Sequence, residues 1–297
     1  MYTVLAVTLA VIGSACNAWA SVLQHHVVDT TVSNDLLDHS RKMSPRRMIT
    51  LLHSPRWWFA ISMVVLGAVF HIIGLALAPI TLVQPIGVLG LVFALLIASR
   101  HRRSWPGGRV WAGAGITVIG IAAFVVVAAD QVSHTEDLHR GDIVWVGLLL
   151  LLLAAGFGVV GAVGPAWLRC LAWAAAASTV FGLASALLRT VTVLIGADTP
   201  LLSPIMLGLG GALAVCYVVG GWLAQQAYAS GPPETVMACL TVVDPLVAVG
   251  FGIVVLREGV GITTGGGVAM AAAGLVAATG AVVLARHHPD ATKAYSG

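Results

Sequence analysis

Long apolar runs alternate with short charged stretches along almost the whole of this 297-residue chain. A helix that crosses a bilayer needs about 20 mostly apolar residues, because each residue advances the helix by about 1.5 Å. Two of the runs contain a charged residue deep inside them, Arg189 and Asp244. The pattern predicts about nine spanning helices, at 2–23, 57–78, 80–99, 110–129, 143–163, 170–196, 203–228, 234–256 and 262–285.

The run 57–99 contains no charged residue and is about twice as long as one span requires. Pro79 lies near its middle, and a proline inside a helix removes a backbone hydrogen bond and breaks or kinks the helix. We therefore expect two helices joined by a tight turn in this region.

The distribution of Lys and Arg predicts the orientation, because basic residues concentrate in cytoplasmic loops. With the N-terminus outside and the C-terminus inside, all but three of the 15 basic residues fall in cytoplasmic segments. The exceptions are Arg140 and Arg257 in external loops and Arg189 inside a helix. We expect a multi-pass protein of the cell (inner or plasma) membrane in this orientation.

The segment 27–55 is too highly charged to span, since it contains three Asp and several basic residues. Its sequence leaves two interpretations open. Apolar residues such as Leu36, Leu37, Leu51 and Leu52 favour a short amphipathic helix at the cytoplasmic interface. A solvated cytoplasmic loop fits the composition equally well.

The two halves of the chain resemble each other. Gln84-Pro85 lies in one predicted helix and Asp244-Pro245 in another, and each is followed by a loop and a glycine-rich helix. In the predicted orientation these two helices run in opposite directions, as in the inverted repeats of secondary transporters. We expect an all-α membrane protein with four spans in the first repeat (1–129), five in the second (143–285) and a cytoplasmic tail (286–297).

The composition supports this class. Hydrophobic residues make up 59% of the chain and charged residues 9%, and the mean hydropathy is +0.97, whereas soluble domains contain about 25% charged residues. The net charge of +3 gives no reason to expect a nucleic acid partner. The four cysteines lie in apolar runs without metal-ligand spacing, and no nucleotide or hydrolase motif occurs. We expect no enzymatic activity, catalytic residue, metal site or cofactor.

Three stretches resemble the drug/metabolite transporter superfamily, in particular its EamA-like members. They are 76–85 (ALAPITLVQP), 225–232 (QQAYASGP) and Asp244-Pro245 with Glu258 downstream. The resemblance implies a secondary transporter built from two inverted repeats. The first half departs from the ten-helix pattern of that superfamily, because the polar segment 27–55 replaces the second helix. This nine-helix form is similar to the NIPA-type magnesium transporters, whose Ala-Pro-x-Thr-Leu-Val-x-Pro pattern also matches 78–85.

Asp244 is the strongest candidate for a functional residue. It lies about ten residues into a predicted span, where an acid costs about 2.5–3.5 kcal/mol to insert. Pro245 frees a backbone carbonyl that can line a cavity. Asp244 is thus either a proton or cation site or an acid permanently paired for structural reasons. Arg189 can pair with Asp244, bind an anionic group of the cargo, or extend to the outer interface.

Three uncharged polar residues are further candidates. Gln84 is the repeat equivalent of Asp244, and Pro85 is the equivalent of Pro245. The side-chain amide of Gln84 can bind cargo or the backbone carbonyls freed around Pro85. Gln225 and Gln226 are adjacent and face different directions, so at most one of them lines a cavity well. His71 is a lone histidine inside a span, for which a packing role competes with a role in the site.

The predicted function is a secondary transporter that moves a small, partly hydrophobic metabolite or drug-like solute by alternating access, with Asp244 as a candidate for proton coupling. A magnesium or divalent-cation transporter, a lipid flippase, and a non-transporting membrane subunit that positions a partner are the alternatives. The expected partners are a small-molecule or lipid-like substrate and membrane lipids. Small residues at four-residue spacing also suggest close helix packing or a homodimer face; they are Gly265, Ala269, Ala273 and Ala277.

Overall fold

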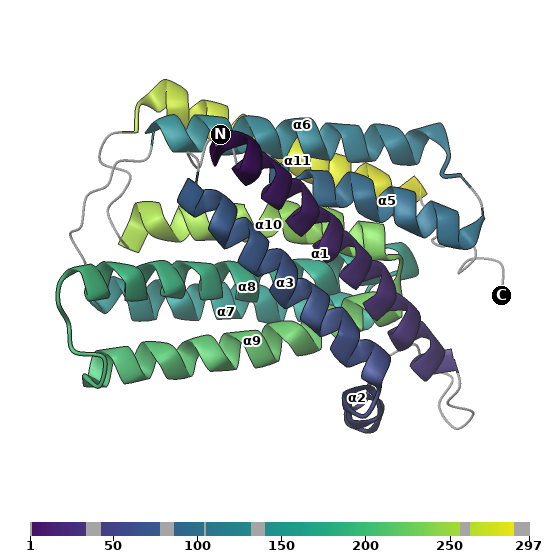
Figure 1. The fold of residues 1–297 in the computed structure, drawn as a ribbon, viewed down its shortest axis with the longest axis horizontal. Coiled ribbons are helices and arrows are strands. Elements are labelled where there is room, and N and C mark those ends of the chain that lie inside the picture. The colour runs from purple at the N-terminus through teal and green to yellow at the C-terminus, as the bar shows by residue number, and fades with distance from the viewer. Residues whose placement is uncertain are drawn as a thin grey trace.

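The computed structural model describes residues 2–33, 43–77, 86–103, 105–131, 140–255 and 262–287. Helices are the only regular elements in these ranges. Figure 1 shows most of them lying side by side along the long axis of the molecule. The helices are α1 (Tyr2–Ser33), α2 (Pro45–Leu52), α3 (Pro55–Leu77), α5 (Leu89–Arg102), α6 (Gly108–Gln131), α7 (Arg140–Val163), α8 (Ala166–Gly196), α9 (Pro204–Ser230), α10 (Pro233–Val255) and α11 (Thr264–His287).

Eight of the described helices are long and apolar enough to cross a membrane. They correspond to eight of the nine predicted spans. The ninth, 80–99, overlaps α5, which is described over 14 residues, and its first residues lie outside the described ranges. In the described part of the run 57–99, α3 and α5 are separate helices, and residues 78–85 between them lie outside the described ranges.

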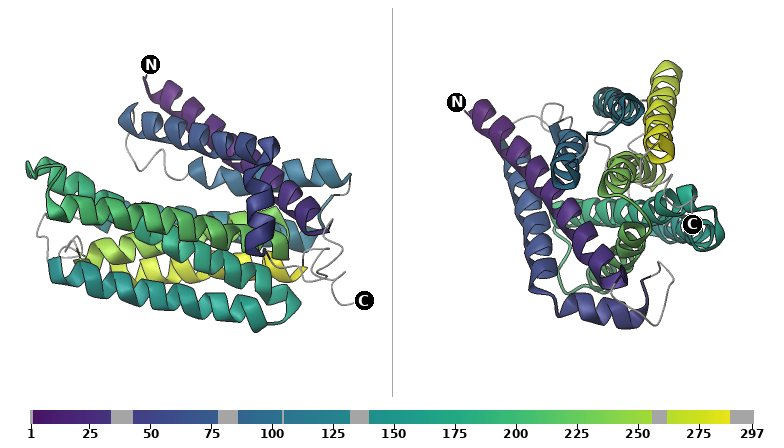
Figure 2. Two further views of the ribbon diagram at one scale, coloured as in Figure 1. Left: turned by 90° about the horizontal axis from the view of Figure 1, so that it is seen from below. Right: turned by 90° about the vertical axis from the view of Figure 1, so that its right-hand side faces the viewer.

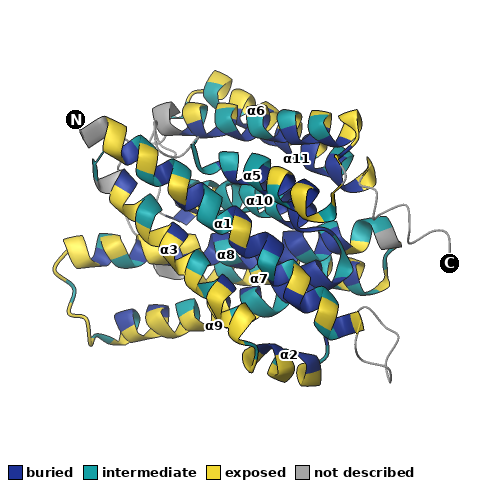
Figure 3. Ribbon diagram, turned by 45° about the vertical axis from the view of Figure 1, so that its right-hand side comes forward, coloured by how far each residue is buried: buried dark blue, intermediate teal, exposed yellow. Residues whose placement is uncertain are grey.

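The outer surface of the bundle is apolar. On α7 the side chains of Trp145, Leu149 and Leu152 are 73%, 64% and 70% exposed. Figure 3 shows buried residues concentrated on the central helices α8 and α10, with many exposed residues along α3 and α9. A water-soluble monomer rarely exposes apolar patches of this extent, so the chain is an all-α multi-pass membrane protein.

The first helix is longer than predicted. α1 continues to Ser33 rather than ending near residue 23, because Val27, Val28 and Val32 are buried in a cluster with residues of α8, α9 and α10. The predicted polar segment 27–55 is therefore partly helical. Residues 34–42 lie outside the described ranges.

The short helix α2 is the amphipathic helix that one of the two interpretations of the segment 27–55 expects, and its place at the membrane interface stays a prediction. Ser44 caps it by accepting a hydrogen bond from the Arg47 amide at 3.3 Å. Leu51 is fully buried, whereas Ile49 and Leu52 are about half exposed. Such a helix has one face for the protein and a second apolar edge for the lipid interface.

The helices pack in a recurring pattern. α1 packs mainly on α3 and α5, α8 packs mainly on α9, α10 and α7, and α6 pairs with α11 along its length. Seen end-on in the right panel of Figure 2, α1 and α3 run obliquely to the other helices. The core lies between α8, α10 and α1.

Glycine allows α6 and α11 to pack closely. A Cβ atom at Gly120 would lie 2.4 Å from the backbone nitrogen of Ala277, and one at Gly280 would lie 2.4 Å from the nitrogen of Thr117. Of the small-residue stripe suggested as a scaffold or dimer face, Ala273 and Ala277 are buried within the chain, whereas Gly265 and Ala269 are exposed.

Candidate functional site

Asp244 lies where α10 crosses α8. Its Oδ1 accepts a hydrogen bond from the Ser185 hydroxyl at 3.2 Å. The two helices approach closely because Gly182 has no side chain: a Cβ atom there would lie 2.9 Å from the Asp244 carbonyl oxygen and 2.7 Å from the Val247 Cβ. The sequence thus places a half-buried carboxylate beside a hydroxyl deep inside a spanning helix.

Pro245 changes the backbone next to this carboxylate. α10 continues through it from Pro233 to Val255, but proline has no amide hydrogen for the carbonyl four residues earlier, at Thr241. The Thr241 hydroxyl donates to the Met237 carbonyl at 2.7 Å. The Thr241 carbonyl is therefore a further acceptor one turn from Asp244.

Arg189 follows Ser185 by one turn on α8, so both residues belong to one face of that helix. Ser185, Arg189 and Thr192 are all exposed, whereas Ala184, Ala186 and Thr190 between them are buried. The exposed residues form a polar stripe that leads from Asp244 toward the end of α8. This places the predicted pair Asp244 and Arg189 in one region of the protein.

The remaining candidates from the first half of the sequence are Gln84, with Pro85 after it, and His71. Gln84 and Pro85 are outside the described residues. The Ser14 hydroxyl of α1 lies 3.1 Å from the carbonyl oxygen of the next residue, Ile86, and 2.9 Å from that of Ala10, so its hydrogen is shared between two acceptors. His71 on α3 is half-buried, and its Cε1 lies 3.8 Å from where a Cβ atom at Gly87 would be.

Gln225 belongs to a different region from Asp244. It is 2% exposed, and its Nε2 donates to Oε1 of Gln24 at 2.9 Å. Gln226 is also buried and forms two hydrogen bonds with the Met43 backbone, at 2.9 and 2.8 Å. Both glutamines therefore connect α9 to the first part of the chain.

These glutamines are part of a buried polar group that we call the junction cluster. Glu234 is fully buried and forms an ion pair with Arg102 of α5. The Tyr228 hydroxyl donates to Ser21 Oγ at 3.0 Å, and the Tyr228 carbonyl lies 3.0 Å from His25 Nδ1. The junction cluster consists of Ser21, Gln24, Arg102, Gln225, Gln226, Tyr228 and Glu234.

The junction cluster joins the two halves of the chain at one end of the bundle. In Figure 1 the last turns of α1, α5 and α9 and the first turn of α10 meet on the right-hand side. Glu234 and Asp244 are ten residues apart on α10, which is about 15 Å along a helix. The site at Asp244 thus lies farther from this end of the bundle than the junction cluster.

Sequence reasoning missed Glu234 and Arg102. Glu234 follows Pro232-Pro233, as a residue of a solvated turn would, and Arg102 lies among other basic residues at a helix end. One signal was present: Gln24 on α1 and the adjacent Gln225 and Gln226 on α9 are amides inside otherwise apolar helices. Buried amides need partners, and here they bond across the two halves.

Within the described ranges, no group of three or more His, Cys, Asp or Glu side chains is placed to hold a metal ion. The chemistry that the arrangement offers at Asp244 is that of one carboxylate, one hydroxyl and one carbonyl acceptor. Such a set can bind a proton or one polar group of a solute.

An uncharacterized protein of Corynebacterium glutamicum is 24% identical to this chain over 293 residues, which cover 95% of this chain and 95% of the relative. No family model matches the chain, and no solved structure matches it. The chain is thus similar along nearly its whole length to a bacterial protein whose name states no activity.

Proposed function

We propose that the chain is a secondary transporter in which two inverted halves move against each other around Asp244. The packing pattern supports two equivalent halves. α1 packs on α3 and α5 as α8 packs on α9 and α10, and α6 pairs with α11. Matching these helices in order leaves α7 without an equivalent. On this matching, the helix that the first half lacks is the first helix of the repeat, whereas the family resemblance implied that it lacks the second.

One observation carries the proposal. In both halves a serine hydroxyl of a long helix reaches a residue that is next to a proline in the sequence: Ser14 of α1 contacts the carbonyl of Ile86, which follows Pro85, and Ser185 of α8 bonds to Asp244, which precedes Pro245. The first contact joins α1 to Ile86, which precedes the start of α5 at Leu89, and the second joins α8 to α10. In the packing, the pair of α1 and α5 corresponds to the pair of α8 and α10. In a nine-span chain these pairs run in opposite directions, as an inverted-repeat transporter requires.

The conformation itself fits one state of a transport cycle. The junction cluster closes one end of the bundle through the Arg102–Glu234 ion pair and the Gln24–Gln225 hydrogen bond. Toward the other end, the polar stripe of Ser185 and Arg189 is exposed. In the predicted orientation the closed end is cytoplasmic, so we interpret this conformation as outward-facing.

The cargo that suits this site is a small, partly hydrophobic solute. Asp244 and Ser185 offer few polar contacts, and the helices around them are rich in Leu, Val and Ala. Asp244 is also the candidate for a coupling proton, because an acid in the membrane interior exchanges its proton when water or cargo reaches it.

The proposal is tested by solute flux in proteoliposomes of the full chain. Ethidium and radiolabelled leucine serve as cationic and zwitterionic, partly hydrophobic probes, and labelled divalent cation tests the magnesium alternative. We expect a pH gradient to drive accumulation of at least one organic probe, and Asp244→Asn to abolish that accumulation. Asp198→Asn is the matched control, since Asp198 is exposed in the α8–α9 connection at a φ of 55° that asparagine tolerates.

Three outcomes would count against the proposal. Divalent-cation flux without organic-solute flux would favour the magnesium alternative. No flux of any probe, together with stable co-purification of one partner protein, would favour the non-transporting subunit. Unchanged pH dependence in Asp244→Asn would remove this residue from proton coupling.

A further inference from the structure

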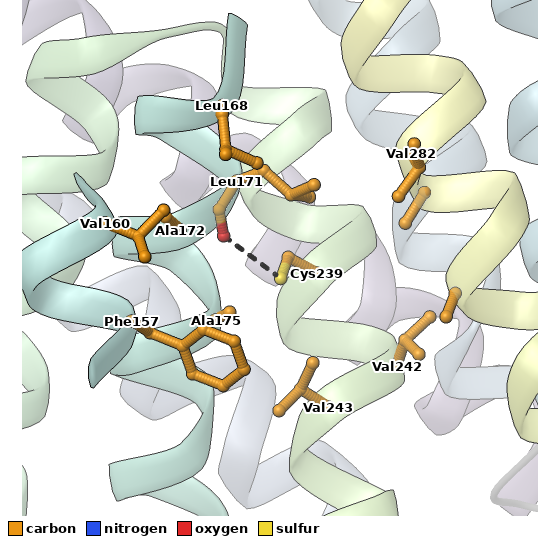
Figure 4. A pocket seen from close by; sticks show the side chains of 12 residues that line it. Phe157, Val160, Leu168, Leu171, Ala172, Ala175, Cys239, Val242, Val243 and Val282 are labelled. Carbon is orange, nitrogen blue, oxygen red and sulfur yellow. Dashed lines mark hydrogen bonds between the residues drawn. The ribbon is translucent and has the colours of Figure 1, made fainter. Parts of the chain in front are cut away.

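A cavity of about 260 Å³ lies between α7, α8, α10 and α11. Figure 4 shows the aliphatic and aromatic side chains around it, with the Cys239 thiol directed toward the Leu171 carbonyl at 3.7 Å. Apolar cavities of about 150 Å³ remain dry and take up apolar ligands. The lining residues are Phe157, Val160, Leu168, Leu171, Ala172, Ala175, Cys239, Val242, Val243, Ala278, Ala281 and Val282.

One end of the cavity has basic and aromatic neighbours. Leu168 lies in the first turn of α8 and Val282 near the end of α11. One turn beyond Val282, the Arg286 guanidinium carbon lies 4.5 Å from the centre of the Trp167 ring, so this contact bridges the two helices. Arg169, next to Leu168, is exposed, and its Nε donates to the Gly164 carbonyl at 3.0 Å.

We propose that this cavity is a binding site for a phospholipid with an anionic headgroup. One acyl chain occupies the apolar cavity, and Arg169 and Arg286 bind the phosphate at the level of the helix ends. The charges are complementary, and tryptophan and arginine at this depth are typical of the membrane interface. In the predicted orientation this end faces the cytoplasmic leaflet, which is rich in anionic lipids.

The lipid site is independent of the transport proposal. It uses neither Asp244 nor the junction cluster, although Val242 and Val243 of its wall belong to α10. An acyl chain is favoured over a soluble cargo, because every side chain of the lining is apolar or a thiol. A protein in a bilayer is also continuously exposed to acyl chains at this position.

Lipid retention by the purified full chain tests the proposal. The delipidated protein in detergent is offered dioleoyl-phosphatidylglycerol or dioleoyl-phosphatidylcholine, and bound lipid is counted by native mass spectrometry. We expect one retained phosphatidylglycerol and weaker retention of phosphatidylcholine. Arg286→Gln should weaken phosphatidylglycerol binding roughly fivefold, the effect of one basic residue near an anionic surface, and Arg169→Gln should do the same. Arg109→Gln, an exposed arginine at the same end, should change nothing.

A second variant tests the cavity itself. Ala278→Phe should fill part of it and abolish retention of both lipids, whereas Ala272→Phe, at an exposed position of the same helix, should retain them. The headgroup assignment would be overturned by equal retention of the two lipids, or by unchanged phosphatidylglycerol binding in the Arg169→Gln/Arg286→Gln double variant. Neither measurement depends on whether Ala278→Phe folds. Wild-type retention in a folded Ala278→Phe protein would overturn the acyl-chain site.

Discussion

Replacing Arg102 by Gln should shift the protein from the junction-closed state toward a junction-open state. Removing one partner of a fully buried ion pair costs about 3–5 kcal/mol. Glu234 is fully buried, but 27% of the Arg102 side chain is exposed, so solvent screening reduces the cost to about 1–3 kcal/mol. The closed state should therefore lose population about 5- to 150-fold relative to the open state.

Cys170 provides the assay for this shift. It is buried beneath the α9–α10 turn, where a Cβ atom at Gly231 would lie 2.8 Å from its sulfur. In a variant that keeps Cys170 as the sole cysteine, opening of the junction should expose the thiol to maleimide. We expect Arg102→Gln to raise the labelling rate at least fivefold, in proportion to the open population.

Two further variants separate the ion pair from a general effect of charge. Arg100→Gln removes an exposed arginine of the same helix and should leave the labelling rate unchanged. Adding Glu234→Gln to Arg102→Gln should restore most of the protection, because no charge then remains buried without its partner. A wild-type labelling rate in Arg102→Gln would refute the reasoning. If Arg100→Gln raises the labelling rate equally, the ion pair is not the cause of the increase.

Three other predictions follow from the packing and the charges. Gly120→Leu should destabilise the purified protein by about 2–3 kcal/mol, because its side chain would overlap the α11 backbone; Gly115→Leu, with open space around its Cβ, should leave the thermal midpoint unchanged. Cysteines at Gln24 and Gln225, when cross-linked, should stop solute flux and reduction should restore it; full flux in the cross-linked protein would exclude this contact as a gate. A reporter fused after Gly297 should be cytoplasmic, and an external reporter would reverse the predicted orientation.

The apolar runs predicted most of the helices because a membrane makes the signal simple. Each span must be long, apolar and free of unsatisfied backbone groups. The end of α1 was not predicted because His25, His26 and Asp29 interrupt the apolar run. Only the tertiary structure shows Val27, Val28 and Val32 packed in the core, and that packing determines where the helix ends.

The site was predictable only in part, for a related reason. Asp244 stands out in the sequence because a lone acid inside an apolar run is costly. Its partner Ser185 does not stand out, since serine is common in membrane helices and only the close approach at Gly182 brings the two together. Glu234 and Arg102 are 132 residues apart, so their pairing follows from the fold and from no local pattern.

Movement of the two halves is the central claim, and two distances measured by pulsed electron paramagnetic resonance test it most directly. Spin labels at the exposed positions Ser33 and Val163 report on the junction end, and labels at Val4 and Leu201 report on the opposite end. In Arg102→Gln we predict that the first distance lengthens while the second shortens, relative to the same labels in the chain with Arg102. If each distance distribution keeps one unchanged peak, or if both distances lengthen together, the halves do not alternate and the account is contradicted.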